Sequence, residues 1–513
     1  MKATLRCRLA ARKRQIQRRL DRAELGNCAE PVFTASNIRY EMADRVRGLA
    51  YGGIGAMHLL ARKIGLIDAI DKGLSLLKVH LPYHESDHVL NIAYNALCNG
   101  TCLQDLELRR NDAVFLDALG ARRIPDPTTA GDFCRRFDGA AINRLQDIFD
   151  DVRIGLWQQQ PADFFDQAIV DVDGTLVETT GHCKAGMDIA YNGVWGYHPL
   201  VVSLANTREV LRLVNRSGNR PSHEGAADAL DRAIATCLRG GFRRVLLRGD
   251  TDFSQTQHLD RWHRDGRIRF IFGYDCKANL KDLADSLPEH VWHRLERPGR
   301  PRPEAGTRQR PDNVKDRIVR EREFETLRLA HEDIADWDYQ PHACAREYRL
   351  IIVRKNISRE KGELRLFDEV RYFFYLTNDY ESTPEQIVCG ANYGANHRCD
   401  QENLLAQLHG GCHALHAPVD NLTSNWAYMV MTALAWNLKA WAALVLPETH
   451  GRWREKYRAE KLWLSGLEFK TFVNALIAIP CQLVRQARGL IFRVLAYHPH
   501  QATFFRLVDA LHG

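Results

Sequence analysis

The chain contains 513 residues, 45% of them hydrophobic, which is enough for several cores in domains of about 100–200 residues each. Lysine and arginine number 71 against 64 aspartates and glutamates, a formal net charge of +7. The 13 cysteines form no CxxC pair and no signal peptide is recognisable, which excludes a disulfide-stapled secreted domain and indicates a reduced, cytoplasmic protein. The most apolar stretch, Trp426–Trp436, is shorter than the roughly 20 residues of a membrane span, so it predicts a core helix and no membrane partner.

Positive charge is concentrated in two segments of the chain. Met1–Arg22 carries nine lysines and arginines against one acid, and Arg294–Arg322 carries ten against five. Such clusters favour a polyanionic partner such as nucleic acid, and a solvated helix face is the competing interpretation. For the first segment we predict that DNA is contacted by Arg12, Lys13, Arg14, Arg18 and Arg19.

Residues 1–164 predict a helical N-terminal DNA-binding region, because apolar residues such as Leu5 and Leu9 recur there at helical spacing. The stretch PDPTTAGDFCRRF predicts one of these helices, with a cap at Thr129. Arg135 and Arg136 would project from that helix, either toward DNA or as surface arginines without a ligand.

Residues 165–280 predict the first part of an α/β core. Ala168–Val172 is a short apolar strand, HPLVVSLA and EVLRLVNRSG predict an antiparallel hairpin, and RRVLLRGD and IRFIFGYD predict two further strands. Two helices lie between these strands, one capped by Ser222 and closed by Gly240–Gly241, the other at Gln255–Asp265. The order β-β-β-α-β-α-β is that of a ribonuclease H-like core.

The remaining chain divides into three predicted segments. Residues 281–384 predict a β-containing basic insertion with the loop RPGRPRPEAGTRQRP and the strands EYRLIIVRKN and VRYFFYLTN. Residues 385–447 predict the second part of the core, with a helix that begins near His397. Residues 448–513 predict a helical C-terminal region.

The stretch IVDVDGTLVETT, Ile169–Thr180, suits two classes of enzyme. In a phosphatase of the haloacid-dehalogenase type, Asp171 and Asp173 would be nucleophile and general acid, whereas in a metal-dependent nuclease one aspartate would bind a divalent cation. The phosphatase interpretation leaves no well-placed lysine between Asp173 and Asp250, and it gives the basic segments no role. The nuclease interpretation is therefore favoured.

Three acids form the predicted catalytic set of that nuclease. Asp173 and Asp250 end strands that are neighbours in a ribonuclease H-like sheet, and the helix NHRCDQENLLAQLHGG adds Glu402, with Arg398 four residues earlier on the same face. Carboxylate oxygens suit Mg²⁺ or Mn²⁺, and two such ions about 4 Å apart would serve both the attacking and the leaving oxygen of a phosphodiester. Arg398 would hold a phosphate, and Asp171 and Asp252 are near-alternatives for the first two ligands.

Long blocks of the sequence resemble the DDE transposases of bacterial insertion sequences, in the cut-and-paste group with a β-rich insertion between the second Asp and the Glu. The matching blocks are DVDGTLVETTG, NGVWGYHPLVVSLANTREVLRLVNRSGNRPSHEGAADALDRAI, FRRVLLRGDTDFSQTQHLDRW, RFIFGYD, YFFYLTNDY, HRCDQENLLAQL, NWAYMVMTALAWNLKAW and IPCQLVRQARGLIFRVLAYHP. The likeness extends over most of the chain, and these long blocks are more specific than the three acids.

The resemblance implies that Asp173, Asp250 and Glu402 bind the metal ions and that Arg398 is the arginine of the group's Y-(2)-R-(3)-E-(6)-K signature. The tyrosine position holds Ala395, with Tyr393 two residues earlier, and the lysine position holds His409, which we predict to contact DNA.

The same resemblance implies the reaction and the partners. The reaction would be Mg²⁺-dependent nicking and strand transfer at terminal inverted repeats of double-stranded DNA, first at the transposon ends and then at target DNA. A homodimer would hold two ends in a synaptic complex, the N-terminal helices would recognise sequence, and further phosphate contacts would come from C-terminal helices carrying Arg485, Arg488 and Arg493. A domesticated copy that binds DNA without cutting it is the remaining alternative.

Overall fold

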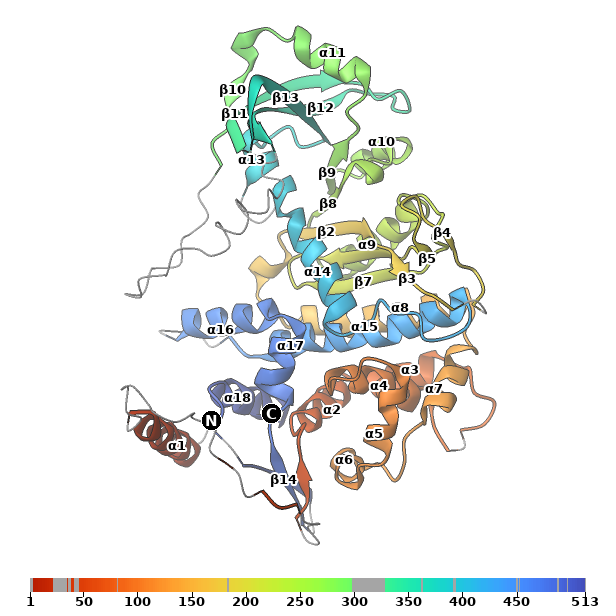
Figure 1. Cartoon of the computed structure of the whole chain (residues 1–513), viewed down its shortest axis with the longest axis vertical. Coiled ribbons are helices and arrows are strands. Elements are labelled where there is room, and N and C mark those ends of the chain that lie inside the picture. Colours follow the sequence, from red (N-terminus) through yellow and green to blue (C-terminus); the bar gives the residue numbers. More distant parts are fainter. Residues whose placement is uncertain are drawn as a thin grey trace.

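The structure of the protein is a computed structural model that describes residues 3–21, 35, 38–40, 46–80, 82–181, 184–297, 328–360, 363–390, 394–448, 451, 453–486, 489–495 and 497–512. It combines one large mixed sheet with many helices (Figure 1). The helices of the N-terminal third lie on one side of the long helix α15 (Leu422–Val445), and the sheet lies on the other. The protein is therefore a mixed α/β structure.

The core of the large sheet has the strand order β9-β8-β2-β6-β7. β2 runs parallel to β8, β8 runs parallel to β9, and β2, β6 and β7 are antiparallel neighbours. The interiors of β2, β6 and β8 are buried on both faces, as expected for apolar runs in a sheet that helices cover. These strands are β2 (Ala168–Gly174), β6 (Leu200–Leu204), β7 (Glu209–Val214), β8 (Val245–Gly249) and β9 (Ile268–Tyr274).

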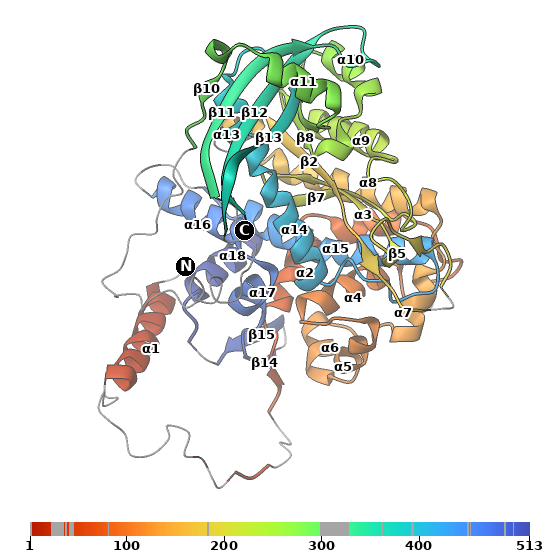
Figure 2. The same cartoon turned by 45° about the horizontal axis from the view of Figure 1, so that its top comes forward.

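The β-containing insertion continues this same sheet beyond β9. Its order is β10-β11-β12-β13, and β13 pairs antiparallel with β9 from Thr377 opposite Ile271 to Phe374 opposite Tyr274. Figure 2 shows these long strands fanning out beside α11. β11 and α11 fall where no element was predicted, and the loop RPGRPRPEAGTRQRP lies outside the described residues apart from its first residue, Arg297. The bounds are β10 (His293–Arg294), β11 (Arg328–Tyr339), β12 (Tyr348–Glu360), β13 (Glu363–Thr377) and α11 (Ala278–Ser286).

The N-terminal third is helical, as predicted, apart from the short strand β1 (Gly48–Leu49). The cap of α7 is Asp126, whose carboxylate accepts hydrogen bonds from Thr129, so the prediction of a cap at Thr129 is wrong. The basic helix α1 has no buried residue, and Leu5 and Leu9 of its predicted apolar stripe are only partly buried. The helices are α1 (Ala3–Asp21), α2 (Ile54–Lys63), α3 (Leu66–Gly73), α4 (Glu85–Leu97), α5 (Leu106–Arg110), α6 (Ala113–Leu119), α7 (Pro127–Cys134) and α8 (Gly139–Trp157).

The helices of the core occupy the predicted places, but one cap differs. The N-cap of α9 is Gly225, which has the left-handed conformation, so the prediction of a cap at Ser222 is wrong. The carbonyl oxygen of Ser222 accepts a hydrogen bond from Arg216. Gly241, with φ of 108°, ends α9 as predicted. The remaining helices are α9 (Ala226–Gly240), α10 (Thr256–Arg264), α13 (Pro384–Cys389), α14 (Cys399–Gly410), α16 (Arg454–Gly466), α17 (Phe469–Phe472) and α18 (Gln501–His512). Single turns are η1 (Leu103–Asp105), η2 (Ala162–Phe165), η3 (Thr251–Phe253), η4 (Glu289–Val291), η5 (Ala395–Arg398) and the π-type η6 (Val473–Ile477).

The prediction that residues 448–513 are wholly helical is wrong. β14 (Cys481–Gln486) and β15 (Gly489–Val494) form an antiparallel hairpin, and β1 pairs with β14. Burial alternates along both strands, so CQLVRQ and GLIFRV follow the period of two residues that marks a half-exposed strand. A third small sheet, β3-β5-β4, consists of β3 (Val177–Glu178), β4 (Asp188–Ile189) and β5 (Trp195–Tyr197).

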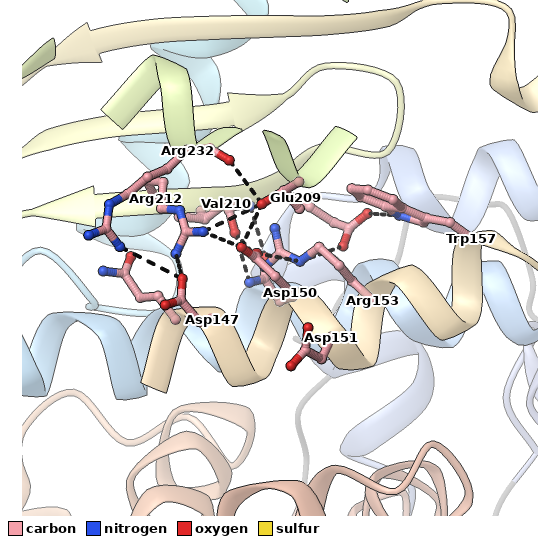
Figure 3. Close-up of polar contacts among 12 residues, drawn as sticks. Asp147, Asp150, Asp151, Arg153, Trp157, Glu209, Val210, Arg212 and Arg232 are labelled. Carbon is pink, nitrogen blue, oxygen red and sulfur yellow. Dashed lines mark hydrogen bonds and ion pairs between the residues drawn. The ribbon is translucent and has the colours of Figure 1, made fainter. Parts of the chain in front are cut away.

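A buried network of charged side chains joins α8 to β7 and α9 (Figure 3). Asp150 accepts a hydrogen bond from Thr236 Oγ1 at 2.7 Å and pairs with Arg212. Glu209 accepts hydrogen bonds from the indoles of Trp157 at 2.9 Å and Trp441 at 2.7 Å. Because buried charges are stable only when they are paired, this network fixes α8 and α15 against the edge of the sheet.

The core helix predicted around Trp426–Trp436 is part of α15, which is buried over most of its length. In the described part of the chain, no helix combines the length and the apolar character that crossing a membrane would require.

Candidate active site

The strand order of the sheet brings the first two predicted acids together. Asp173 lies near the end of β2, and Asp250 directly follows β8, which is the parallel neighbour of β2. Parallel neighbours end at the same edge of a sheet, so both carboxylates reach the same side of it. Asp171 and Asp173 are two residues apart and point to one face, which α14 covers.

Arg398 and Glu402 come from the start of α14, beside the same edge. Arg398 is the last residue of η5 and the N-cap of α14, and Glu402 lies in the first turn of that helix. Leu404, Leu405 and Leu408 are buried beneath them, as predicted, and hold the helix against the core. Gly410 and Gly411 end the helix.

The guanidinium of Arg398 lies among the three carboxylates. Its Nη1 donates a hydrogen bond to Asp173 Oδ2 at 3.1 Å and lies 3.8 Å from Asp250 Oδ2. Its Nη2 lies 3.6 Å from Glu402 Oε1. Four residues from three distant parts of the chain therefore meet at one point, with one cation among three anions.

Burial and neighbouring negative charge raise the pKa of Asp173 and of Asp250. Burial raises the pKa of Asp173 to about 6, the Arg398 guanidinium opposes this rise, and the carboxylate of Asp250 adds to it. Burial likewise raises the pKa of Asp250, again against the effect of Arg398. One arginine thus does not fully compensate the negative charge, and the site favours additional positive charge.

The near-alternative Asp171 has a different role. It is 1% exposed, and both its oxygens accept hydrogen bonds from Arg248 at 2.7 Å. Arg248 also donates to Gly394 O at 3.1 Å, so the pair ties β2 and β8 to the segment that precedes α14. Asp171 is therefore a buried anchor, out of reach of a substrate, and the phosphatase interpretation loses its nucleophile.

An open groove of about 760 Å³ begins at Asp173 and Asp250. Sequence reasoning missed three residues of its other walls, namely His198, Arg220 and His223. His198 directly follows β5 and lies three residues before Val201, the strand partner of Asp173. The sequence could have indicated His198 only through the predicted pairing of β2 with β6, which brings the start of β6 next to Asp173. The near-alternative Asp252 also lines the groove, and its backbone nitrogen donates to Asp250 Oδ1 at 3.1 Å.

The predicted DNA contacts are distributed over several surfaces. Arg12 of α1 donates a hydrogen bond to Val494 O at 3.3 Å, and Lys13, Arg14, Arg18 and Arg19 are exposed on the same helix. Arg135 is engaged by Asp132 at 2.8 Å and by Asp420 at 3.0 Å, whereas Arg136 is exposed.

The other predicted DNA contacts lie on α14 and on the β14–β15 hairpin. His409 is half-buried and exchanges a hydrogen bond with Thr175 Oγ1 at 3.0 Å, so it connects α14 to the segment after β2. Arg485 and Arg493 lie on the β14–β15 hairpin rather than on helices, and Arg485 is 3.1 Å from Asp117. Tyr393 and Arg488 lie outside the described residues.

The chemical type of the three acidic side chains suits a hard divalent cation. Asp173, Asp250 and Glu402 offer only oxygen ligands, and burial raises the pKa of both Asp173 and Asp250. Within the described residues, however, no three histidine, cysteine, aspartate or glutamate side chains already stand at metal-binding distances from one common point. Arg398 takes the space among the acids instead.

Comparison with known protein families gives a match over most of the chain. The family described as "Transposase DDE domain group 1" matches residues 49–513. No curated protein matches the chain. A solved structure, the cryo-EM structure of the piggyBac transposase synaptic complex with hairpin DNA, aligns at 12% identity and a TM-score of 0.35, covering 83% of this chain and 81% of that one.

Proposed function

The chain belongs to the transposase family defined by the DDE domain of group 1, and from this premise we propose that it cuts and joins DNA by metal-dependent phosphoryl transfer. The observation that carries the proposal is the convergence of Asp173, Asp250 and Glu402 on the guanidinium of Arg398. Members of this family generally use divalent metal ions. For this chain we propose Mg²⁺ or Mn²⁺.

The strand order supports a ribonuclease H-like catalytic core. Three antiparallel strands followed by two parallel ones, in the spatial order β7-β6-β2-β8-β9, place the first and fourth strands of the core side by side. We propose the division 1–164 for DNA binding, 165–280 and 385–447 for the core, 281–384 for the insertion and 448–513 for the C-terminal region.

Each residue of the site has a distinct proposed role. Asp173, Asp250 and Glu402 would hold two ions, which would supply charge stabilisation at the attacked phosphodiester. Arg398 would orient a non-bridging phosphate oxygen through its planar fork, once it leaves the carboxylates. His198, Arg220 and His223 form the other wall of the groove and would hold the DNA backbone in line for attack.

The partners follow from this reaction. The substrate would be double-stranded DNA at the ends of an insertion sequence, and then target DNA. Both are contacted through phosphates that position the duplex without reading its sequence. We propose that the exposed basic helix α1 belongs to this contact and that two copies of the chain act together on two ends.

A nicking assay on DNA that carries the inverted repeats flanking the gene tests the proposal. Wild-type protein with Mg²⁺ or Mn²⁺ nicks the repeat ends, whereas Asp250→Asn and Glu402→Gln bind the same DNA without nicking it. The matched control is Asp252→Asn, which removes an acid from the same groove without removing a contact to Arg398, so it retains nicking.

The outcomes separate the alternatives. A wild type that binds the repeats and never nicks identifies a domesticated DNA-binding copy. Release of phosphate from small phosphomonoesters, abolished by Asp171→Asn, would restore the phosphatase. Equal loss of nicking in Asp252→Asn and Asp250→Asn would show that the acid set is wrongly assigned.

A further inference from the structure

A second depression, separate from the catalytic acids, lies in the helical N-terminal third. Two adjoining cavities of about 410 and 610 Å³ share the walls Pro82, Tyr83 and Arg123. Their sides come from the segment before α4, from α5 and α6, and from the stretch 121–136 around α7. We call this feature the Tyr83 groove.

The rim of the Tyr83 groove is cationic because the fold gathers basic residues from four separate segments. These residues are Lys78, Arg110, Arg122, Arg123 and Arg136, all of them exposed. Only Arg110 has an acidic partner, Glu107 at 3.3 Å, among the contacts of the described chain. Arg123 lies over the ring of Tyr83, with 5.7 Å between the guanidinium carbon and the ring centroid.

The acids that line the groove do not neutralise this rim. Asp126 accepts hydrogen bonds from Thr129, and Asp132 pairs with Arg135 at 2.8 Å. Asp87 accepts a hydrogen bond from the backbone nitrogen of His84 at 2.9 Å. Among the described contacts none of these three acids pairs with a residue of the rim, and the five cations of the rim outnumber them, so positive charge remains in excess at the groove.

The floor of the groove is apolar and rigid. His88 is 5% exposed and stacks on Phe133 with 4.2 Å between ring centroids, and Tyr83 packs against His88 edge-on at 5.4 Å. Burial and the charge of Arg136 lower the pKa of His88 to about 4, so this histidine is neutral and adds no charge at pH 7. Packed aromatic side chains therefore lie beneath the arginines of the rim.

The groove is mechanically connected to the catalytic side of the molecule. Arg135, at the end of α7, pairs with Asp420 at 3.0 Å, and Asp420 O accepts a hydrogen bond from Ala185 N at 2.7 Å. Ala185 leads into β4, and Tyr191, which follows β4, lines the groove of Asp173 and Asp250. Figures 1 and 2 both show α7 on the side of the molecule that carries the β3-β5-β4 sheet.

We propose that the Tyr83 groove binds the phosphate backbone of duplex DNA that extends away from the cleaved bond. Several exposed arginines without acidic partners, arranged over a few helical segments, match a row of phosphodiesters, and the Arg135–Asp420 pair keeps this row in a fixed relation to the acids. The inference rests on the proposed function, and it adds Lys78, Arg110, Arg122 and Arg123 to Arg136, which the sequence had already indicated as a DNA contact.

The test is a binding experiment on the full-length protein with a fluorescent duplex of the repeat end. The double variant Arg122→Glu/Arg123→Glu weakens binding by about tenfold to a hundredfold at 0.1 M salt. It also reduces the slope of log K against log salt by about 2, because about one counterion is released per phosphate contact. The matched control, Arg454→Glu/Lys456→Glu on α16, removes equal charge on the opposite side of the molecule and retains near wild-type binding.

A kinetic experiment distinguishes this inference from the proposed function. At saturating DNA the Arg122→Glu/Arg123→Glu protein nicks at the wild-type rate, whereas the DNA concentration for half-maximal rate rises in proportion to the lost affinity. Unchanged affinity and an unchanged salt slope in a folded variant overturn the groove assignment, even when wild-type nicking holds. Equally weakened DNA binding by the α16 control variant also overturns the groove assignment, because the loss of affinity would then follow from net charge alone.

Discussion

At the scale of single residues, two aspartates that are adjacent on one face of β2 have different roles. Asp171 is 1% exposed and occupied by Arg248, whereas Asp173 is 14% exposed and reaches the groove beside Asp250. Depth in the sheet separates them, because the end of a strand is open to solvent and its interior is not. Arg398 is then the balancing charge of the open acids, since its guanidinium contacts all three of them.

The position of Arg398 leads to a prediction about metal affinity. Without DNA, Arg398→Gln binds Mn²⁺ about tenfold more tightly than wild type, because a cation near the acids repels the ion that would replace it. Titration of Mn²⁺ followed by electron paramagnetic resonance measures this affinity. Arg220→Gln, which removes a groove arginine that contacts Glu224 and none of the three acids, shows a smaller change. Weaker Mn²⁺ binding by Arg398→Gln would contradict the role assigned here.

A buried lysine gives a prediction about pH. Lys439 in α15 is 1% exposed, donates a hydrogen bond to Ser465 O at 2.8 Å, and has its pKa lowered by burial from 10.5 to about 7. Between pH 7 and 10.5 the unfolded chain keeps a proton that the folded chain has lost, so the free energy of unfolding rises with pH across this window.

Replacement of this lysine tests the sign. Below pH 7 both states are protonated and the cost of burying the charge is fully present, so Lys439→Met is more stable than wild type there by about 2–4 kcal/mol. The difference shrinks as the pH approaches 10. Urea denaturation at pH 6.5 and pH 9.5 measures it, with the exposed Lys281→Met as the control. A stability difference that is independent of pH would show that Lys439 is not the group that titrates.

At the scale of elements, the position of Asp250 depends on how closely β9 approaches the turn that follows β8. Gly273 of β9 lies against that turn, and a Cβ added there would be 2.8 Å from Thr251 N and 3.0 Å from Asp250 C. These are backbone atoms, which cannot move aside as easily as the end of a flexible side chain. β9 therefore helps to determine the position of Asp250, the second proposed catalytic acid.

The corresponding prediction concerns Gly273→Ala. The added methyl group displaces the turn that carries Asp250, so nicking falls by more than about tenfold, since small misplacements of catalytic groups are costly. Gly155→Ala in α8, where an added Cβ meets nothing within 4 Å, is the matched control and leaves nicking unchanged. Nicking rates and circular dichroism of both variants are compared. A fully active Gly273→Ala protein would show that the turn can move without consequence.

At the scale of the whole molecule, Glu209 joins three parts of the chain. It is fully buried on β7 and accepts hydrogen bonds from Trp157 of α8, Trp441 of α15 and Thr207. Arg153 of α8 lies 3.7 Å from it (Figure 3). The N-terminal helices, the C-terminal half and the sheet therefore meet at a single carboxylate.

Glu209→Ala is predicted to destabilise the molecule as a whole. Its removal leaves Arg153 without one of its two acidic neighbours and two buried indoles without acceptors, which costs about 3–5 kcal/mol. Tryptophan fluorescence during urea denaturation measures the loss, and Trp157 and Trp441 are two of the ten tryptophans that contribute to it. Asp151→Ala, an exposed acid paired with Arg239 at 3.1 Å, changes the midpoint little. Equal midpoints for the two variants would contradict the central position of Glu209.

The sequence by itself determined the elements of the core and their order. Buried strands such as Ala168–Val172 consist of apolar runs, and helices such as Leu422–Val445 have apolar residues on every side, so local composition already specifies them. Prediction from the local sequence pattern was wrong where a segment suits both the helical period and the two-residue period of a strand. The hairpin Cys481–Val494 was predicted as helix, and the caps of α7 and α9, Asp126 and Gly225, each lie three residues away from the predicted ones.

The sequence had also grouped the residues of the candidate site, but only the tertiary structure decided their geometry and the walls of the groove around them. Asp173, Asp250 and Arg398 are far apart in the chain, and they meet because β2 and β8 are parallel neighbours and α14 lies across their edge. The same holds for the rim of the Tyr83 groove, whose arginines have no common motif and converge from separate segments. Periodicity along a chain reports burial of each element, whereas proximity between elements is set by packing, which the sequence does not display.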